Sequence, residues 1–218
     1  MNPVLVTFTG ADQWTDQNAM LALSQEYPVE WGILFSRKRQ GVDPRYPSLD
    51  HVERFMRTGL RFAAHICGAY SREIMGERTF DPPVDLRKFA RVQVNHGSPV
   101  GKRIKDALGH WSPVQGIAQA RGVEFPEDES VQWLYDTSGG KGSVPGQWPV
   151  YPGRFAGYAG GINPGNVLSV IEAIGATGPY WIDMESGVRT GERFDVGLCR
   201  TVCEKVFGRA TAHRGNGA

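Results

Sequence analysis

Two glycine-containing turns near the end of the chain have the residue types and spacing of a phosphate site. Gly160 and Gly161 follow a short apolar stretch, and Asn163 then caps a predicted helix whose apolar residues recur at helical spacing. Glycines let backbone N–H groups approach a ligand closely, and a helix N-terminus adds partial positive charge. The next unit repeats this design with Ser186 and Gly187 after a second apolar stretch.

The alternative is that these glycines only form tight turns between a strand and a helix. A single turn would favour that alternative. Two successive units at the end of a chain are instead typical of the phosphate site that follows strands seven and eight of a (β/α)8 barrel. We therefore predict a phosphate site built from Gly160, Gly161, Asn163, Ser186 and Gly187.

Three further residues are candidates for proton transfer. Asp136 ends the apolar stretch 131–135, and a carboxyl group in a closed apolar site can keep its proton near neutral pH. Capping of its own glycine-rich loop is an equally supported alternative. Cys67 ends the stretch 62–67, although a buried, inert cysteine is more common than a reactive one. Asp12 follows the first apolar stretch, where capping of the first helix is the other interpretation.

These candidates lie at the ends of segments that alternate between strand and helix patterns. Eight stretches are predicted as strands: 4–8, 29–35, 62–67, 89–94, 114–118, 131–135, 155–159 and 180–184. An open doubly wound sheet also fits this alternation, but the paired turns and the polar residues that end nearly every strand favour a closed barrel. We predict a single (β/α)8 TIM barrel over residues 1–210 and a frayed tail over residues 211–218.

The composition excludes several function classes. The 218 residues include 24 Lys and Arg against 23 Asp and Glu, a net charge of +1, so no basic face for nucleic acid or an acidic membrane is expected. No apolar run reaches membrane-spanning length, and the first residues lack the pattern of a signal peptide. Cys67, Cys199 and Cys203 have neither disulfide-framework nor metal-ligand spacing. A cytoplasmic protein without a cofactor or metal is the expectation.

Several more polar residues end predicted strands, namely His65, Asn95, His96, Asp183 and Glu185. A histidine in such a position is usually a structural residue with its hydrogen bonds satisfied. Their spacing matches no known pattern of metal ligands, so no metal site is predicted.

Four groups of residues together resemble one known family. They are 32–36 (Gly-Ile-Leu-Phe-Ser) with 43–48 (Asp-Pro-Arg-Tyr-Pro-Ser), 134–137 (Leu-Tyr-Asp-Thr) with 139–142 and Trp148, 159–167 (Ala-Gly-Gly-Ile-Asn-Pro-Gly-Asn-Val), and 183–188 (Asp-Met-Glu-Ser-Gly-Val). In this order, and over nearly the whole chain, they are similar to motifs of the phosphoribosylanthranilate isomerases of tryptophan biosynthesis.

The resemblance implies a TIM barrel that catalyses an Amadori-type rearrangement of an N-linked ribose phosphate. In this reaction a general acid opens the sugar ring and a general base takes a proton from a sugar carbon. The family's acid corresponds to Asp136 and its anthranilate-binding arginine to Arg45, although Arg45 also fits a solvated basic loop. We place His65, His96 and Gly140 among the further substrate contacts.

The chain departs from the family at two positions. The family's base is a cysteine in a Lys-x-Cys-Gly stretch, where this chain has Thr9, and an unactivated hydroxyl has no basic form near neutral pH. Asp12 and Cys67 are then the candidate bases. Glu185 replaces a serine of the family's phosphate turn, and a carboxylate repels a phosphate unless it is protonated or paired.

The predicted function is an acid–base isomerase, similar to phosphoribosylanthranilate isomerase, that acts on a small phosphorylated ribose-type substrate. The alternative is a related barrel that has lost catalysis and binds a phosphate ligand or a protein partner. The predicted partner is a small phosphorylated metabolite, with no nucleic acid and no membrane. The sequence does not predict the oligomeric state.

Overall fold

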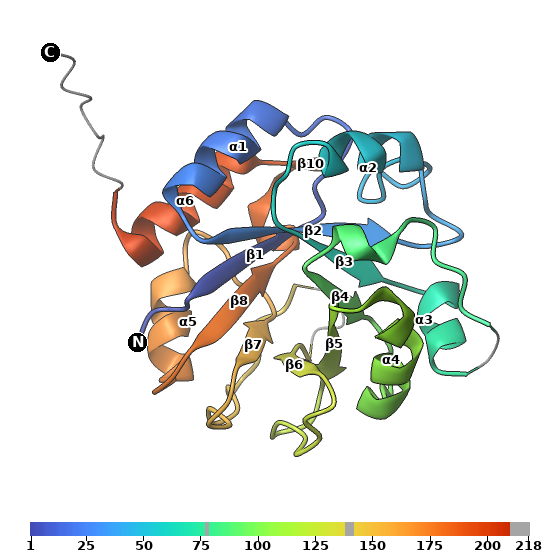
Figure 1. Ribbon diagram of the computed structural model, residues 1–218. Coiled ribbons are helices and arrows are strands. Elements are labelled where there is room, and N and C mark those ends of the chain that lie inside the picture. Colours follow the sequence, from blue (N-terminus) through green and yellow to red (C-terminus); the bar gives the residue numbers. More distant parts are fainter. Residues whose placement is uncertain (77–78, 138–141, 210–218) are drawn as a thin grey trace, which may run out of the picture.

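Eight parallel strands form a closed barrel at the centre of the computed structural model (Figure 1). The structure describes residues 1–76, 79–137 and 142–209. The strands follow one another around the barrel in chain order: β1 (Leu5–Thr9), β2 (Val29–Phe35), β3 (Phe62–Ile66), β4 (Arg91–Val94), β5 (Gln115–Ala120), β6 (Gln132–Tyr135), β7 (Ala156–Ala159) and β8 (Tyr180–Met184). The predicted TIM-barrel fold is confirmed, and each predicted stretch overlaps one of these strands.

The barrel closes through pairing of its first and last strands. Strand β8 pairs in parallel with β1, so that Val6 lies opposite Ile182 and Thr7 lies opposite Asp183. Because side chains alternate across a strand, Thr7 and Thr9 share the inner face of β1, and Asp183 lies on the inner face of β8. This register brings Thr9 and Asp183 to the same end of the barrel.

Helices surround the barrel in the order of the chain (Figure 1). They are α1 (Gln17–Glu26), α2 (Leu49–Met56), α3 (Ala69–Ile74), α4 (Gly101–Leu108), α5 (Val167–Ile174) and α6 (Val196–Phe207), with 3-10 turns η1 (Leu86–Lys88), η2 (Gly109–Trp111) and η3 (Ser186–Val188) and a small hairpin of β9 (Arg189–Thr190) and β10 (Arg193–Phe194). The segments 121–131 and 142–155, which follow β5 and β6, contain no helix, as their lack of helical periodicity predicts. None of the helices in the described part of the chain has both the length and the apolar character needed to cross a bilayer.

Two predicted helix caps are displaced in the structure. Helix α1 is capped by Asp16, whose carboxylate accepts from Asn18 N at 2.8 Å, and not by Asp12. Helix α5 begins after Asn166 rather than after Asn163. Asn163 instead shapes the turn before the helix, where its side-chain oxygen accepts from Gly165 N at 2.8 Å. The interpretation of Asn163 and Asp12 as helix caps was therefore wrong.

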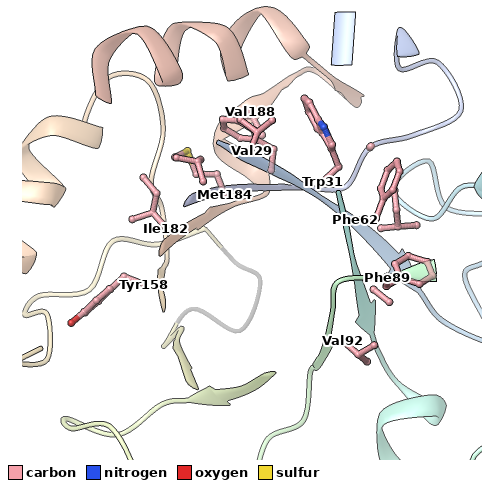
Figure 2. Close-up of a cluster of buried hydrophobic side chains, with 14 of the residues drawn as sticks. Val29, Trp31, Phe62, Phe89, Val92, Tyr158, Ile182, Met184 and Val188 are labelled. Carbon is pink, nitrogen blue, oxygen red and sulfur yellow. The ribbon is translucent and has the colours of Figure 1, made fainter. Parts of the chain in front are cut away.

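The hydrophobic core has two layers. The outer layer lies between the strands and the helices, and includes Trp31, Phe62 and Met184 (Figure 2). The smaller inner layer fills one side of the barrel with Ile117, Leu134, Ala159 and Trp181. Burial of this apolar surface on both faces is the main stabilising contribution to a barrel of parallel strands.

The other side of the barrel interior holds a buried ion pair. The Arg91 guanidinium on β4 contacts both carboxylate oxygens of Glu30 on β2, at 3.0 and 3.1 Å from Nε, and donates to Thr7 Oγ1 at 3.1 Å. It also lies over the Trp181 ring, 4.3 Å from its centroid. Burial raises the pKa of Glu30, but Arg91 and Arg61 outweigh it and hold this pKa below its usual value.

Candidate active site at the barrel mouth

A polar cavity lies at the carboxyl ends of the strands. It encloses about 60 Å³, room for a few water molecules, within a hollow of about 500 Å³ that includes its open mouth. Its lining comes from the inward-facing carboxyl ends of β1, β3, β4, β5 and β8 and from the segments that follow β6, β7 and β8. The polar side chains in its lining are Thr9, His65, Gln93, Gln119, Asp136, Asp183, Glu185 and Ser186.

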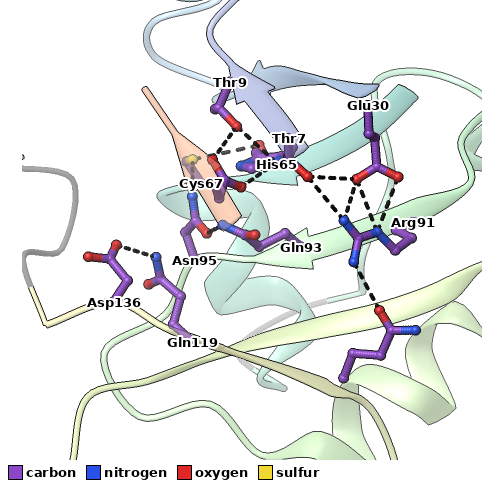
Figure 3. Close-up of polar contacts among 12 residues, drawn as sticks. Thr7, Thr9, Glu30, His65, Cys67, Arg91, Gln93, Asn95, Gln119 and Asp136 are labelled. Atoms are coloured by element: carbon purple, nitrogen blue, oxygen red, sulfur yellow. Dashed lines mark hydrogen bonds and ion pairs between the residues drawn. The ribbon is translucent and has the colours of Figure 1, made fainter. Parts of the chain in front are cut away.

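Three side chains from three strands form a buried cluster at the bottom of this cavity (Figure 3). Thr9 Oγ1 donates to Asp183 Oδ1 at 2.9 Å and lies 3.4 Å from His65 Nε2. The second oxygen, Asp183 Oδ2, is 3.8 Å from His65 Nε2. It is buried without a hydrogen-bond partner among the described residues, as is Gln93 Oε1. Two such buried oxygens in one cavity are groups that a ligand or an ordered water would satisfy.

The burial of this cluster changes its protonation. Burial raises the pKa of Asp183 to about 8, even though the Thr9 hydrogen bond opposes the shift. Burial also lowers the pKa of His65 to about 4. Both groups are therefore uncharged at neutral pH, because removal from water penalises the charged form of each. Asp183 is a proton donor at neutral pH, which is the property expected of a general acid.

The raised pKa of Asp183 predicts a specific dependence of stability on pH. Between pH 6.5 and 8 the folded state holds a proton on Asp183 that the unfolded state, with an Asp pKa of about 3.9, does not hold. The free energy of unfolding should therefore fall by up to ~1.4 kcal/mol per pH unit as pH rises through this range. His65 opposes this slope only at the lower end of the range, near pH 6.5, where the unfolded imidazole still binds protons and the folded one does not. Urea unfolding at several pH values measures the slope.

Asp183→Asn removes the titrating group and should flatten this slope. Asp195→Asn is the matched control, because hydrogen bonds from Thr190 and from the start of α6 lower the pKa of Asp195 and move its effect to acid pH. An Asp183→Asn variant with the slope of the parent protein would contradict the assignment of a protonated Asp183.

Asp136 lies across the cavity from this cluster. It follows β6 directly, is 6% exposed, and accepts from Gln119 Nε2 at 3.1 Å (Figure 3). Its backbone N–H donates to Ala120 O at 3.0 Å, which fixes the point where the β6 ladder ends. A positioned carboxyl group in a polar cavity that holds a second carboxyl group, on Asp183, is an arrangement suited to proton transfer.

Arg45 is outside the cavity lining but pairs with Glu185, which belongs to that lining. Its Nη1 donates to Glu185 Oε1 at 3.0 Å, which joins the loop after β2 to the turn after β8. Burial raises the pKa of Glu185 although Arg45 opposes the shift. The carboxylate that would repel a phosphate is therefore paired with an arginine. Arg45 is thus neither a freely solvated side chain nor a cation without a partner.

The two glycine-containing turns meet at the cavity edge. Gly160 and Gly161 have φ values of +118° and +62°, and both line the cavity together with Ser186. A Cβ on Gly187 would lie 2.0 Å from Ile162 O, so this glycine allows the two turns to pack together. Asn163 and Gly187 support the turns from outside the cavity lining.

Two of the candidate proton-transfer residues have other surroundings. Asp12 is fully buried outside the lining, where its carboxylate accepts from Arg189 Nη2 at 3.1 Å and from Phe194 N at 2.8 Å. Cys67 lies beside Asn95 Nδ2 at 3.2 Å, and burial raises the pKa of its thiol to about 11. These contacts favour a structural role for Asp12 and an un-ionised thiol for Cys67.

The remaining predicted substrate contacts lie in three different places. His65 lines the cavity, whereas the His96 ring accepts from Ser98 N at 3.2 Å away from it. Gly140 lies outside the described residues. The predicted frayed tail, which is not a substrate contact, also lies outside them. Thr9, Gln93 and Gln119 were not predicted as site residues. Their signal in the sequence is alternation, since each is the inward-facing polar residue nearest the carboxyl end of its strand.

The protein has the architecture of the TIM-barrel enzymes. These enzymes have their active sites at the carboxyl ends of the barrel strands, where this barrel has its polar cavity. No group of three or more His, Cys, Asp or Glu side chains among the described residues is placed to hold a metal ion.

Comparison with known proteins shows which solved structures have a similar barrel. No family model and no curated protein matches the chain. Among solved structures, phosphoribosylanthranilate isomerase from Thermotoga maritima has a TM-score of 0.61 and 16% identity, and the match covers 94% of this chain and 100% of that one. The enzyme from Thermococcus kodakaraensis has a TM-score of 0.61 and 14% identity, and the match covers 94% of this chain and 99% of that one. The enzyme from Pyrococcus furiosus has a TM-score of 0.61 and 16% identity, and the match covers 93% of this chain and 98% of that one. The resemblance predicted from the motifs is confirmed as a shared fold.

Proposed function

We propose that the protein is an acid–base isomerase acting on a small phosphorylated, ribose-type substrate. The observation that carries the proposal is the pair of carboxyl groups in one cavity, Asp183 with its proton retained and Asp136 held by Gln119. Two titratable groups in different environments are the usual arrangement for dividing acid and base roles. The structural neighbours, all described as phosphoribosylanthranilate isomerases, support the same class of reaction.

The roles are assigned from the protonation of Asp183 and the position of Asp136. Asp183 starts with its proton and is the acid that protonates the ring oxygen as the sugar ring opens. Asp136, which Gln119 holds in the cavity, takes the proton from the neighbouring sugar carbon. This assignment reverses the role that the family resemblance implied for Asp136. It also removes the need for a base at Thr9, whose hydroxyl orients Asp183.

The phosphate group is proposed to bind the turns at Gly160, Gly161 and Ser186. Any side chain at Gly161 would collide with Val144 N at 2.6 Å, so Ser186 is the better position for a test. Inorganic phosphate should raise the melting temperature of the parent protein by binding the native state. Ser186→Asp places a carboxylate beside the turns and should abolish this shift, whereas Ser186→Ala should retain it. A full shift in Ser186→Asp would move the phosphate site elsewhere.

Turnover is the direct test of the proposal. Phosphorylated aldoses and N-linked ribose phosphates are incubated with the protein, and NMR detects conversion of the aldose to the ketose form. Isomerisation of any member would support the proposal. Phosphate binding without turnover of any member would favour the alternative, a barrel that binds a phosphorylated ligand without catalysis.

A further inference from the structure

His65 is a buried titratable group to which the proposed reaction assigns no role. It lies near the carboxyl end of β3, is 2% exposed, and lines the cavity of the candidate active site. Its Nε2 atom is 3.4 Å from Thr9 Oγ1 (Figure 3) and 3.8 Å from Asp183 Oδ2. One ring nitrogen therefore faces both the proposed acid and the hydroxyl group that orients this acid.

The available hydrogen atoms decide the direction of these contacts. A threonine hydroxyl has one hydrogen, and Thr9 donates it to Asp183 Oδ1 at 2.9 Å. Thr9 Oγ1 can then only accept a hydrogen bond from His65. Burial lowers the pKa of His65 to about 4, so its ring is neutral at neutral pH and has a single N–H. The contact with Thr9 requires that this hydrogen is on Nε2.

The same count places the carboxyl proton of Asp183, which burial retains at neutral pH. Oδ1 accepts from Thr9, as the carbonyl oxygen of a protonated carboxyl group does, and Oδ2 has no hydrogen-bond partner among the described residues. Oδ2 is therefore the oxygen with the proton. A lone pair on His65 Nε2, 3.8 Å away, would compete for this proton, whereas an N–H does not. The Nε2–H form of His65 thus leaves the proton for a ligand in the cavity.

Gly32 makes the contact between Thr9 and His65 possible. These two residues are on β1 and β3, and Gly32 lies on the intervening strand β2, opposite Thr9. A Cβ on Gly32 would lie 2.3 Å from Thr9 Oγ1 and 2.9 Å from His65 Nε2. A side chain at this position would therefore force the two groups apart. Because Gly32 has none, a residue of β3 reaches the hydroxyl group of a residue on β1.

Charged groups on other elements also act on this cluster. Glu30 on β2 and Arg91 on β4 form the buried ion pair of the barrel interior, and their effects on the pKa of Asp183 oppose one another. Glu185, in the turn that follows β8, raises the same pKa, and Asp136 lines the same cavity. Burial has a larger effect than any charge in this set and keeps the proton on Asp183. The hydrogen bonds of the cluster then determine which oxygen holds it.

We propose that His65 is a positioning residue for the acid of this barrel. In its Nε2–H form it donates to Thr9, directs the Thr9 hydroxyl hydrogen to Asp183 Oδ1, and thereby keeps the carboxyl proton on Oδ2. The catalytic part of this proposal rests on the proposed function, whereas the arrangement of protons does not.

The proton on Oδ2 is the one transferred when the sugar ring opens. The O–H bond at Asp183 Oδ2 breaks, and an O–H bond forms at the ring oxygen. The C–O bond of the ring breaks in the same step with its electron pair on the oxygen, and the linked nitrogen supplies the lone pair that the carbon then needs. The electron pair of the broken O–H bond stays on the Asp183 carboxylate, which retains the hydrogen bond from Thr9.

Nitrogen-15 NMR of the histidine side chains tests the arrangement of protons directly. The protein is labelled with nitrogen-15 histidine, and His65→Gln identifies the His65 signals by their loss. Between pH 6 and 8 these signals should show a neutral ring with its hydrogen on Nε2 and no titration. A hydrogen on Nδ1, or a charged ring at pH 7, would overturn the proposal.

Two substitutions at His65 separate positioning from packing. Glutamine places an N–H donor near the position of Nε2, whereas leucine fills much of the same space without a donor. His65→Leu should raise the pKa of Asp183, because its carboxylate loses the oriented hydrogen bond from Thr9 that lowers this pKa. The free energy of unfolding should then keep falling with pH above pH 8, where the slope of the parent protein levels off. His65→Gln should have the slope of the parent.

His110→Leu is the matched control and should leave this slope unchanged, because His110 is exposed on η2 outside the cavity lining. Thr9→Val removes the hydroxyl and should raise the pKa of Asp183 as His65→Leu does. Adding His65→Leu to Thr9→Val should change the slope little further, since His65 acts through Thr9. Additive effects, or the parent's slope in His65→Leu, would overturn the proposal. If His65→Leu fails to fold, the NMR signals of the parent decide.

Turnover distinguishes failure of this proposal from failure of the proposed function. On a phosphorylated sugar that the protein isomerises, His65→Leu should lower kcat ~10-fold and move the alkaline limb of its pH profile upward. His65→Gln should retain the parent's values. The parent's kcat and pH profile in His65→Leu would overturn the positioning role. Absence of turnover in every variant would overturn the isomerase, and the NMR signals and unfolding slopes would still decide the arrangement of protons.

Discussion

Asp136→Asn should lower the rate of isomerisation by ~10²–10⁴-fold while leaving the fold intact. Asparagine keeps the shape of the side chain and can still contact Gln119, but it cannot take a proton from a sugar carbon. The altered contact should cost only about 1 kcal/mol of the free energy of unfolding. The rate is measured on whichever phosphorylated sugar the parent protein converts, and stability is measured by thermal melting of the same samples.

Asp106→Asn is the matched control, because Asp106 is exposed on α4 and, among the described residues, pairs only with Lys102 one turn away. Its rate should equal that of the parent. If Asp136→Asn retains the parent's rate, Asp136 has no part in proton transfer. If the variant fails to fold, Asp136 is a structural residue at the end of β6.

Glu30→Ala should destabilise the protein by about 3–5 kcal/mol, the largest effect on stability expected from a single residue here. Glu30 is fully buried and contacts Arg91 through both carboxylate oxygens. Removal of the carboxylate leaves the Arg91 guanidinium, which is 2% exposed, without its compensating charge inside the barrel. Urea unfolding measures the loss.

Two variants separate this explanation from simple loss of packing. Glu26→Ala breaks the surface pair with Arg200 and should leave the unfolding midpoint unchanged. Glu30→Leu combined with Arg91→Met removes both charges and should recover most of the stability, since a buried pair is often replaceable by apolar residues of similar volume. A double variant as unstable as Glu30→Ala would show that packing, and not the unpaired charge, dominates.

The fold was predictable because its signals are local. The eight strands appear as apolar stretches of five to seven residues, and polar residues end nearly all of them. The turn at Gly160 and Gly161 was predictable for the same reason, since both residues have the positive φ that favours glycine. Helix α5 begins three residues later than predicted. Asn163 and Asn166 are both residues that commonly cap helices, but the side chains of both form hydrogen bonds within the preceding turn, and the sequence does not distinguish the two uses.

The chemistry of the site was less predictable because its contacts are long-range. Arg45 and Glu185 are 140 residues apart, and only barrel closure brings them together. Thr9 and Asp183 are 174 residues apart, and the proton on Asp183 depends on burial that no motif records. The missing cysteine at Thr9 was visible, but the hydrogen bond that Thr9 donates to Asp183 was not.

The seam between β1 and β8 has a consequence for how the chain acquires its structure. Contacts between these two strands and their flanking loops join residues separated by most of the chain. Val4 N donates to Tyr180 O at 2.9 Å, and Asp12 pairs with Arg189. During synthesis the first seven strands emerge before their closing partner exists, so β1 keeps an unpaired edge until β8 is complete. Closing so long a loop is entropically costly, which makes this step slow compared with formation of each local β–α unit. The chain is most exposed to aggregation just before its last quarter is made.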